Sequence, residues 1–455
     1  MTRVLLPKHA PSALKRTGGF TLVELLITIS IIAIMASMVL FAVYAAQEAA
    51  RERKTRALIT KLNGIIMERW DEYRTRRVPI AITAGATPLD ASRYRLEAMR
   101  DLMRLELPDR WSDVLDPPVA PYAYPAADKL QRPATSVAFL AKYDSVVGNT
   151  TWPPTSEVLA NQGAECLYMI VMGAVAQLGD SRDFFRADSV ADTDEDGFPE
   201  FVDAWGMPIQ FIRWAPGFQS DLQTPLQAKV SNVGPASSPP SPKQLAITIN
   251  TPTGQASRFS SAPGSYIGGA LAVIDDESQI LASHRIGKIT GYEFNQTTRT
   301  ARFTCSTPSY TNQPPFQHHE PGATTTGPSP PTRGDTIVVM PPDPFDSRGL
   351  YPLYNPGTAA QPTPDVSVPT FALYPLILSP GPDRAYGIKD EAHPTDVNKK
   401  LRYSMSGLNP YFVPEKISED FGLFLGSAPT TGDEDGRWRP GCHLDNIHNH
   451  QLSTR

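Results

Sequence analysis

The chain has 455 residues, of which 41% are hydrophobic and 20% are charged, and its formal net charge is −5. Such a length suffices for a sizeable soluble core, whereas the acidic balance argues against a general nucleic-acid-binding protein, which normally carries a basic surface. The three cysteines permit at most one internal disulfide, so they exclude a disulfide-stapled scaffold.

The first feature in chain order is a basic segment followed by a long apolar run. The run extends from Phe20 to Ala46 and contains a single charge, that of Glu24. Its 27 residues would rise about 40 Å as a helix, which is enough to cross a bilayer core of about 30 Å. A secretory signal peptide instead has an apolar region of about 7 to 15 residues, followed by its cleavage site. We therefore predict a membrane-spanning helix that the protein keeps. The basic residues before it are Arg3, Lys8, Lys15 and Arg16.

Residues 19–24, Gly-Phe-Thr-Leu-Val-Glu, resemble the cleavage motif of type IV pilins and type II secretion pseudopilins. The resemblance implies that a prepilin peptidase cuts between Gly19 and Phe20 and methylates the new amino terminus. It also implies that Glu24 of one subunit pairs with the freed amine of a neighbour during assembly. An ionised glutamate costs roughly 2.5 to 3.5 kcal/mol in a membrane helix, so a partner is physically reasonable. The alternative is that Glu24 lies at the headgroup boundary and reaches water.

Beyond the membrane the helix is expected to continue to about Arg77, because residues 47–54 are rich in helix formers and carry both signs of charge. Apolar residues then follow a spacing of three and four, which predicts one face packed against a globular head. Pro79 bounds this helix. The predicted face consists of Leu58, Leu62, Ile65, Ile66, Trp70 and Tyr73.

The expected fold class is α+β: a long transmembrane and spine helix, then a pilin-like head with further helices and a small antiparallel sheet. Further helices are predicted within 90–116, 135–147 and 155–178, and a few strands within 266–274 and 286–304 of the proline-rich insertion. The expected parts are a leader (1–19), the transmembrane and spine helix (20–77), the helical part and first strand of the head (78–215), a Pro/Ser/Thr-rich insertion (216–333), and a C-terminal strand region with a tail (334–455).

Two segments resemble strands of the major pseudopilins. Residues 203–209 are similar to the segment that opens the small sheet of that family, and a strand is predicted from Ile209 to Trp214. Residues 371–383 resemble the strand that precedes the calcium loop of those proteins. Here Arg384 replaces the expected glycine, so the resemblance predicts the strand more firmly than a metal site after it.

A different acidic loop has the spacing of a calcium ligand set. Asp192, Asp194 and Asp196 occupy loop positions one, three and five, a glycine occupies position six, and Asp203 occupies position twelve. Asp203 is shorter than the usual bidentate glutamate, and Pro199 interrupts the loop. Two interpretations therefore remain open, bound Ca²⁺ or an acidic turn without an ion, and no other cofactor is expected.

The cysteines and histidines give weaker indications. Cys166 lies in an apolar run and is expected to be a small buried hydrophobe. Cys442, His443, His448 and His450 are ligand types for zinc or copper. Their spacing fits no standard site, so a solvated tail is the favoured interpretation.

The chain has no Gly-x-Ser-x-Gly, P-loop or His-Glu-x-x-His motif, and we do not expect an enzyme. The leading hypothesis is a pilin-like structural subunit (pseudopilin) of a type II secretion or type IV pilus-like filament. It would cross the bacterial inner membrane once, with its head in the periplasm or cell exterior. Its partners would be prepilin peptidase, other subunits and an assembly machinery with a motor ATPase.

The main alternative is a single-pass anchored extracytoplasmic binding protein that does not polymerise. A third hypothesis, a minor pilin for DNA uptake, requires a basic patch. Removal of the four basic leader residues would take the net charge from −5 to −9, which does not favour such a patch.

Overall fold

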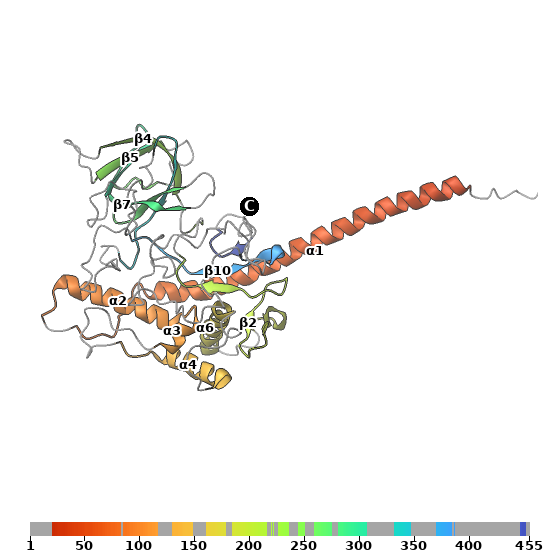
Figure 1. Cartoon of the computed structure of the whole chain (residues 1–455), viewed down its shortest axis with the longest axis horizontal. Coiled ribbons are helices and arrows are strands. Elements are labelled where there is room, and N and C mark those ends of the chain that lie inside the picture. The colour runs from red at the N-terminus through yellow and green to blue at the C-terminus, as the bar shows by residue number, and fades with distance from the viewer. Residues whose placement is uncertain are drawn as a thin grey trace, which may run out of the picture. The chain divides into compact units, whose positions relative to one another are not determined.

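The computed structural model describes residues 21–82, 85–116, 130–148, 161–178, 184–215, 220, 222, 226–235, 244–250, 259–274, 281–306, 332–346, 370–384, 386 and 446–451. The chain divides into two compact units, Met1–Arg51 and Glu52–Arg455 (Figure 1). The boundary falls within the first helix, α1 (Leu22–Glu72), so the two parts of that helix are considered separately.

The part of α1 that belongs to the second unit has one buried face, as its spacing predicted. Its buried residues recur every three or four positions, and Leu58 and Ile65 pack beside them. The helix ends at Glu72, five residues before the predicted end. Just beyond it, Arg76 and Tyr73 both bind the carboxylate of Glu106. Arg76 donates two hydrogen bonds of 2.5 and 2.8 Å to it and the Tyr73 hydroxyl donates one of 2.7 Å. The buried face consists of Thr55, Ile59, Leu62, Ile66 and Trp70.

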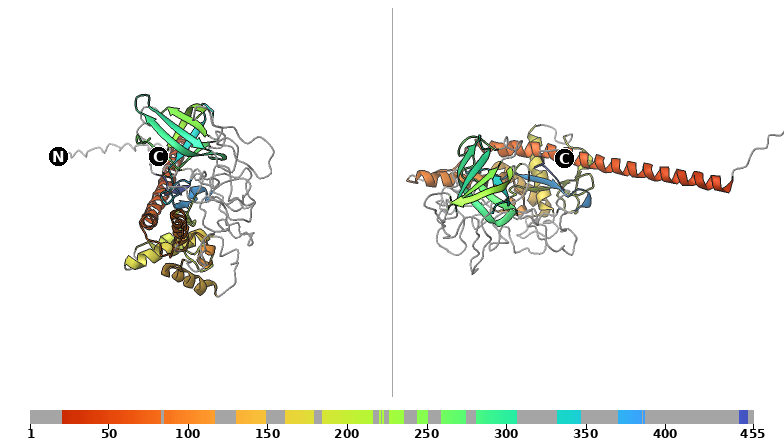
Figure 2. Two further views of the ribbon diagram at one scale, coloured as in Figure 1. Left: turned by 90° about the vertical axis from the view of Figure 1, so that its left-hand side faces the viewer. Right: turned by 90° about the horizontal axis from the view of Figure 1, so that it is seen from above.

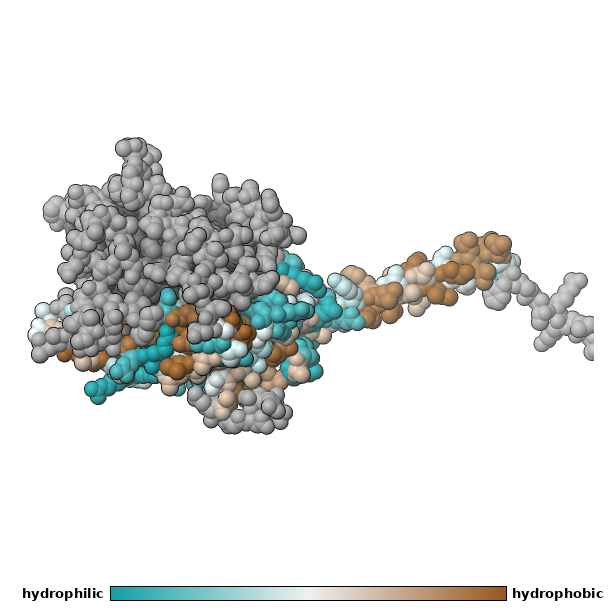
Figure 3. All heavy atoms as spheres, turned by 60° about the horizontal axis from the view of Figure 1, so that its bottom comes forward, coloured by the Kyte–Doolittle hydropathy of each residue, from teal (hydrophilic) through white to brown (hydrophobic). Residues whose placement is uncertain are grey.

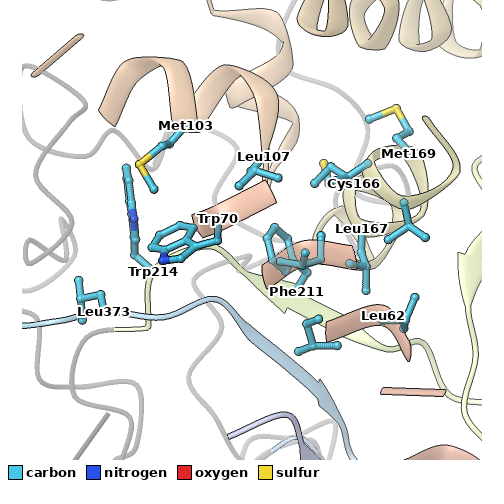
Figure 4. Packing of buried hydrophobic residues seen from close by; sticks show 14 of the residues in the cluster. Leu62, Trp70, Met103, Leu107, Cys166, Leu167, Met169, Phe211, Trp214 and Leu373 are labelled. Carbon is cyan, nitrogen blue, oxygen red and sulfur yellow. The ribbon is translucent and has the colours of Figure 1, made fainter. Parts of the chain in front are cut away.

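The helices predicted in the head are confirmed: those within 90–116 and 135–147 begin one or two residues earlier than predicted, and residues 155–160 of the third lie outside the described part of the chain. They are α2 (Pro88–Glu106), α3 (Trp111–Leu115), α4 (Ala134–Val147) and α6 (Gln162–Leu178). Cys166 is fully buried with a free thiol, as expected, and so is Cys305. Figure 4 shows side chains from α1, α2 and α6 meeting side chains from other parts of the head: Leu62, Trp70, Met103, Leu107, Cys166, Leu167, Phe211, Trp214 and Leu373.

The two strands predicted by resemblance pair with each other. β3 (Gln210–Ile212) and β10 (Leu376–Ser379) are antiparallel, with Leu376 opposite Ile212. Helix α6 approaches this pair closely at Gly163, where a Cβ atom would lie 2.9 Å from the carbonyl oxygen of Phe211. A third strand, β11 (Ile447–His448), completes the sheet in the order β11-β10-β3.

The expectation of one small sheet was too narrow, because the head also contains a closed six-stranded barrel (Figure 2). Its antiparallel strands follow the order β4-β5-β8-β7-β6-β9, and the first five lie within the predicted insertion. The predicted strand regions contribute three of them, β6 to β8. The bounds are β4 (Leu226–Pro235), β5 (Gln244–Asn250), β6 (Ala270–Ile274), β7 (Leu281–Asn295), β8 (Thr300–Ser306) and β9 (Thr336–Met340).

The barrel forms because alternate residues of its strands point to a separate apolar core. In β4, for example, Leu226, Ala228 and Val230 are buried while the residues between them are exposed. Tyr266, Tyr292 and Phe303 fill this core with ring centroids 4.7 to 6.0 Å apart. The opposite face of β6 and β9 packs against the helical core through Ala270, Ala272, Val338 and Met340.

The carboxyl-terminal histidines are part of the fold, so the expectation of a solvated tail was wrong for His450. Its side chain is fully buried; Nε2 lies 2.9 Å from the carbonyl oxygen of Pro375, and Nδ1 lies 3.0 Å from the Ser220 hydroxyl. His448 lies in β11 opposite Leu378. Cys442 and His443 lie outside the described residues.

We expect His450 to make the stability of the head depend on pH. Burial lowers the pKa of His450 to about 4, although its bond to the Pro375 carbonyl opposes this shift. A depressed folded-state pKa means that the stabilisation is complete above the unfolded value of about 6.5 and is lost as the pH falls towards 4, by up to about 1.4 kcal/mol per pH unit. Denaturant unfolding at several pH values should therefore show a smaller pH dependence in His450→Gln than in the wild type. Parallel pH profiles of the two proteins would contradict this assignment.

Candidate functional site

The first candidate site lies at the start of α1, where Thr21 and Glu24 close a reciprocal cap. The Thr21 backbone N–H and hydroxyl each donate a hydrogen bond of 2.9 Å to Glu24 Oε2, and the Glu24 N–H donates one of 3.2 Å to the Thr21 hydroxyl oxygen. This is a capping box, which satisfies amide groups that the first helical turn leaves unpaired. Thr21 was not among the predicted site residues, although Thr-x-x-Glu before an apolar run is a signal for a capping box. Gly19 and Phe20 lie outside the described residues.

The following part of α1 is apolar on every side. Its large hydrophobic side chains are between 48% exposed, at Val43, and 80% exposed, at Leu22, and Figure 3 shows them as brown spheres along this helix. The best 18-residue window has a mean hydropathy of 2.7, so α1 is long and apolar enough to cross a membrane.

The threonine and serine hydroxyl groups of the same segment are satisfied within the helix. Thr28 donates to the Leu25 carbonyl oxygen, and Ser30 to that of Leu26, both at 2.8 Å. Ser37 likewise donates to the Ile34 carbonyl oxygen at 2.7 Å. A bilayer cannot supply such partners, and here none is required. Glu24 is therefore the one side chain of residues 22–46 whose charge needs a partner outside the apolar run.

The second candidate site is the acidic loop between β1 (Val190–Ala191) and β2 (Glu200–Phe201). Asp192, Asp194 and Asp196 come together here, each offering a carboxylate oxygen within 4.8 Å of the others. The loop turns sharply at Glu195 and Gly197, whose φ angles are 60° and 96°. The spacing of the loop predicted these three aspartates as candidate calcium ligands.

Asp203, the fourth residue of the predicted ligand set, lies apart from the other three and binds protein groups. Its Oδ1 accepts hydrogen bonds from the backbone N–H groups of Trp205 and Met207, at 2.8 and 2.9 Å. Its Oδ2 accepts a bond of 2.7 Å from the Ser379 hydroxyl in β10. Asp203 thus fixes the turn before β3 and ties it to β10.

Two glutamates that the sequence analysis did not propose join the acidic loop instead. Glu165 in the first turn of α6 and Glu200 in β2 form a second group with Asp194, again with oxygens within 4.8 Å of one another. Glu165 is 1% exposed and Glu200 is fully buried. Glu165 could have been noticed in the sequence as the one charged residue of the apolar run 164–171, because buried glutamates are rare without a partner.

The electrostatic environment of this cluster is strongly unfavourable to negative charge. Burial, followed by the charges of Asp196 and Asp194, raises the pKa of Glu165 to about 10. Burial also raises the pKa of Asp196 to about 6 and that of Glu200 to about 7, and neighbouring aspartates add to both shifts. Burial is the largest cause of all three shifts, and repulsion between the neighbouring carboxylates adds to it.

Residues 14–40 match the family described as the prokaryotic N-terminal methylation motif. The match covers Lys15 and Arg16 at the end of the basic segment, Gly18 and Gly19, the capping box and most of the apolar run. No curated protein and no solved structure matches the chain. The candidate site at the start of α1 thus lies within a known processing signal, and the acidic loop lies outside it.

Proposed function

We propose that this type IV pilin-like substrate of prepilin peptidase is a structural subunit of a type II secretion or type IV pilus-like filament. The observation that supports it most is the combination of the methylation motif with an apolar helix that carries one carboxylate at its start. In this proposal cleavage between Gly19 and Phe20 creates an amine. That amine is the cation that Glu24 of a neighbouring subunit would meet.

Assembly would proceed through the apolar helices of successive subunits. Side chains that are exposed in the single chain would contact lipid before assembly and neighbouring helices afterwards. Contacts that join different surfaces of successive subunits produce open helical filaments when they do not close into a ring. The subunit would be anchored in the inner membrane with its head outside the cytoplasm, and a motor ATPase of the assembly machinery would supply the work. Its role would be structural rather than catalytic.

Substitutions of Glu24 test this proposal and separate its charge from its cap. Glu24→Gln keeps a side chain that completes a capping box but removes the negative charge. Breaking one partner of a buried ion pair costs about 3 to 5 kcal/mol, which corresponds to more than about 100-fold in subunit association. We expect Glu24→Gln and Glu24→Ala to insert in the membrane as the wild type does, and both to be lost from the sheared filament fraction.

A matched control is Glu48→Gln, which removes the next acidic residue of α1 together with an exposed contact to Arg51. It should assemble normally. Assembly of Glu24→Gln at the wild-type level would show that the cap matters and the charge does not. If the wild type itself never forms filaments alongside a functional assembly machinery, the protein is an anchored monomer and the proposal is withdrawn.

A further inference from the structure

The acidic cluster of the head contains five carboxylates in two overlapping groups. One group consists of Asp192, Asp194 and Asp196 and the other of Glu165, Asp194 and Glu200, so Asp194 belongs to both. In each group the oxygens lie within 4.8 Å of one another. Two oxygens on opposite sides of a calcium ion are about 5 Å apart, because calcium–oxygen distances are 2.3–2.6 Å.

An independent observation is that three buried oxygens of these groups lack a hydrogen-bond partner among the described residues. They are Oε1 of Glu165, Oδ1 of Asp194 and Oδ2 of Asp196. Glu165 is the most informative, because its side chain is 1% exposed and its other oxygen accepts a bond of 2.6 Å from Trp111 Nε1. A buried carboxylate oxygen without a donor is costly unless something else satisfies it.

The surrounding protein donates hydrogen bonds to the cluster, but among the described residues no lysine, arginine or histidine forms an ion pair with it. The Asn161 amide donates to Asp194 Oδ2 at 2.9 Å, and the Thr193 N–H donates to Glu200 Oε2 at 3.0 Å. Lys142 lines the same apolar cavity as Glu165, yet no ion pair joins the two. The missing counter-charge would have to come from a bound cation or from protons.

We propose that Asp192, Asp194, Asp196, Glu200 and Glu165 together bind one calcium ion, which links the β1–β2 loop to helix α6. Oxygen is the only donor type in the set, which favours calcium, magnesium or manganese over zinc and copper. Five carboxylates suit the six to eight oxygen ligands of calcium, whereas magnesium normally takes one or two carboxylates and keeps several waters.

This ligand set differs from the one that the spacing of the loop predicted. Glu200 occupies loop position nine, and Glu165 replaces the acid at position twelve, although it lies 27 residues before the loop begins. Asp203 is not a ligand in this proposal, because both of its carboxylate oxygens already accept hydrogen bonds, Oδ1 from the backbone of the turn before β3 and Oδ2 from the Ser379 hydroxyl. The inference concerns the head alone and does not depend on the filament proposal.

Calcium titration of the full chain in detergent, after removal of metal with a chelator, tests the proposal. Isothermal titration should show saturable binding of about one ion, and the melting temperature should rise by about 5 °C or more at a hundredfold excess of calcium over Kd. Magnesium should bind more weakly. Neither heat nor a rise in melting temperature in the wild type would overturn the proposal.

Three variants assign the ligands. Glu165→Gln keeps an oxygen for the Trp111 bond but removes the charge, and Asp194→Asn removes the charge shared by both groups; each should weaken calcium binding by about tenfold or more. Glu195→Gln is the matched control, because Glu195 lies exposed in the same loop and belongs to neither group, so it should bind calcium as the wild type does.

Wild-type affinity in Glu165→Gln would remove α6 from the site and overturn the proposed ligand set. An equal loss in all three variants would indicate only a diffuse acidic surface, which also overturns the proposal. Should Glu165→Gln fail to fold, terbium luminescence of the wild type and of Asp194→Asn tests the proposed site instead. Terbium in this site would lie beside Trp111 and be sensitised by it. Calcium should displace that emission in the wild type, and Asp194→Asn should lack it.

Discussion

Replacing Gly19 with valine is expected to leave the leader attached to nearly every chain. Gly19 lies within the matched segment 14–40, the resemblance to prepilins implies a cut after it, and glycine is the residue with no Cβ to crowd the scissile peptide. Valine adds a stiff, β-branched side chain at that position. The uncleaved chain would be 19 residues longer than the processed one and would retain four basic residues. Electrophoresis of membrane fractions resolves the two forms.

Gly18→Val is the matched control, because it makes the same change one residue earlier. Cleavage should persist in this variant. Because the uncleaved Gly19→Val chain has no free amine at Phe20, it should also be absent from filaments while remaining in the membrane. Normal processing of Gly19→Val would move the cut elsewhere and would contradict the assignment of this peptide bond.

Replacing Arg213 with alanine is expected to destabilise the head by about 3 to 5 kcal/mol, the cost of leaving buried charges without their partner. Arg213 is fully buried directly after β3, and its Nη1 donates hydrogen bonds of 2.7 Å to both Asp113 and the Leu107 carbonyl oxygen. Its backbone N–H donates to Asp109 at 3.0 Å. Burial alone would raise the pKa of Asp109, but the Arg110 and Arg213 guanidiniums hold it below its usual range.

The alanine variant removes the guanidinium and leaves both aspartates buried, because Asp109 and Asp113 are each 3% exposed in their side chains. Chemical denaturation of the full chain in detergent, at a fixed calcium concentration, measures the change. Arg302→Ala is the control: this arginine is 46% exposed and 3.9 Å from Glu293, so its loss should change stability by less than about 1 kcal/mol. Equal stability changes for both variants would show that the Arg213 network is not a central support of the head.

The elements that local sequence predicts well are those whose pattern is complete within one segment. The three-and-four spacing along α1 predicted its buried face. A tight glycine turn together with a family resemblance predicted β3, and the resemblance of residues 371–383 to a pseudopilin strand predicted β10. In the same way, Thr21 and Glu24 are three residues apart, so their cap is readable from sequence.

The barrel was only partly predictable, because its closure depends on distant segments. β4 pairs with β9, so Leu226 lies opposite Val339, more than a hundred residues later in the chain. β4 and β5 flank a proline-rich stretch that suggested a low-complexity connection. Which segments pair over such distances depends on the packing of the shared core, and a local pattern contains no information about it.

The ligands of the proposed cation site were likewise only partly predictable from sequence. The loop spacing identified Asp192, Asp194 and Asp196, because these ligands lie within five residues of one another. It also suggested Asp203, whose hydrogen bonds to the β3 turn and to Ser379 only the fold reveals. Glu165 could not be assigned to the loop from sequence, since it reaches the site only through the packing of α6 against β2 and β3.

The central claim is that this chain is processed and assembled as a pilin-like subunit. The most direct measurement is the mass of the amino-terminal peptide of the protein isolated from its native membranes. Our account predicts a peptide that begins at Phe20 and carries an added methyl group on its amine. An intact leader before Gly19, or a terminus beyond Ala46, would contradict it and would leave an ordinary anchor or a secreted head.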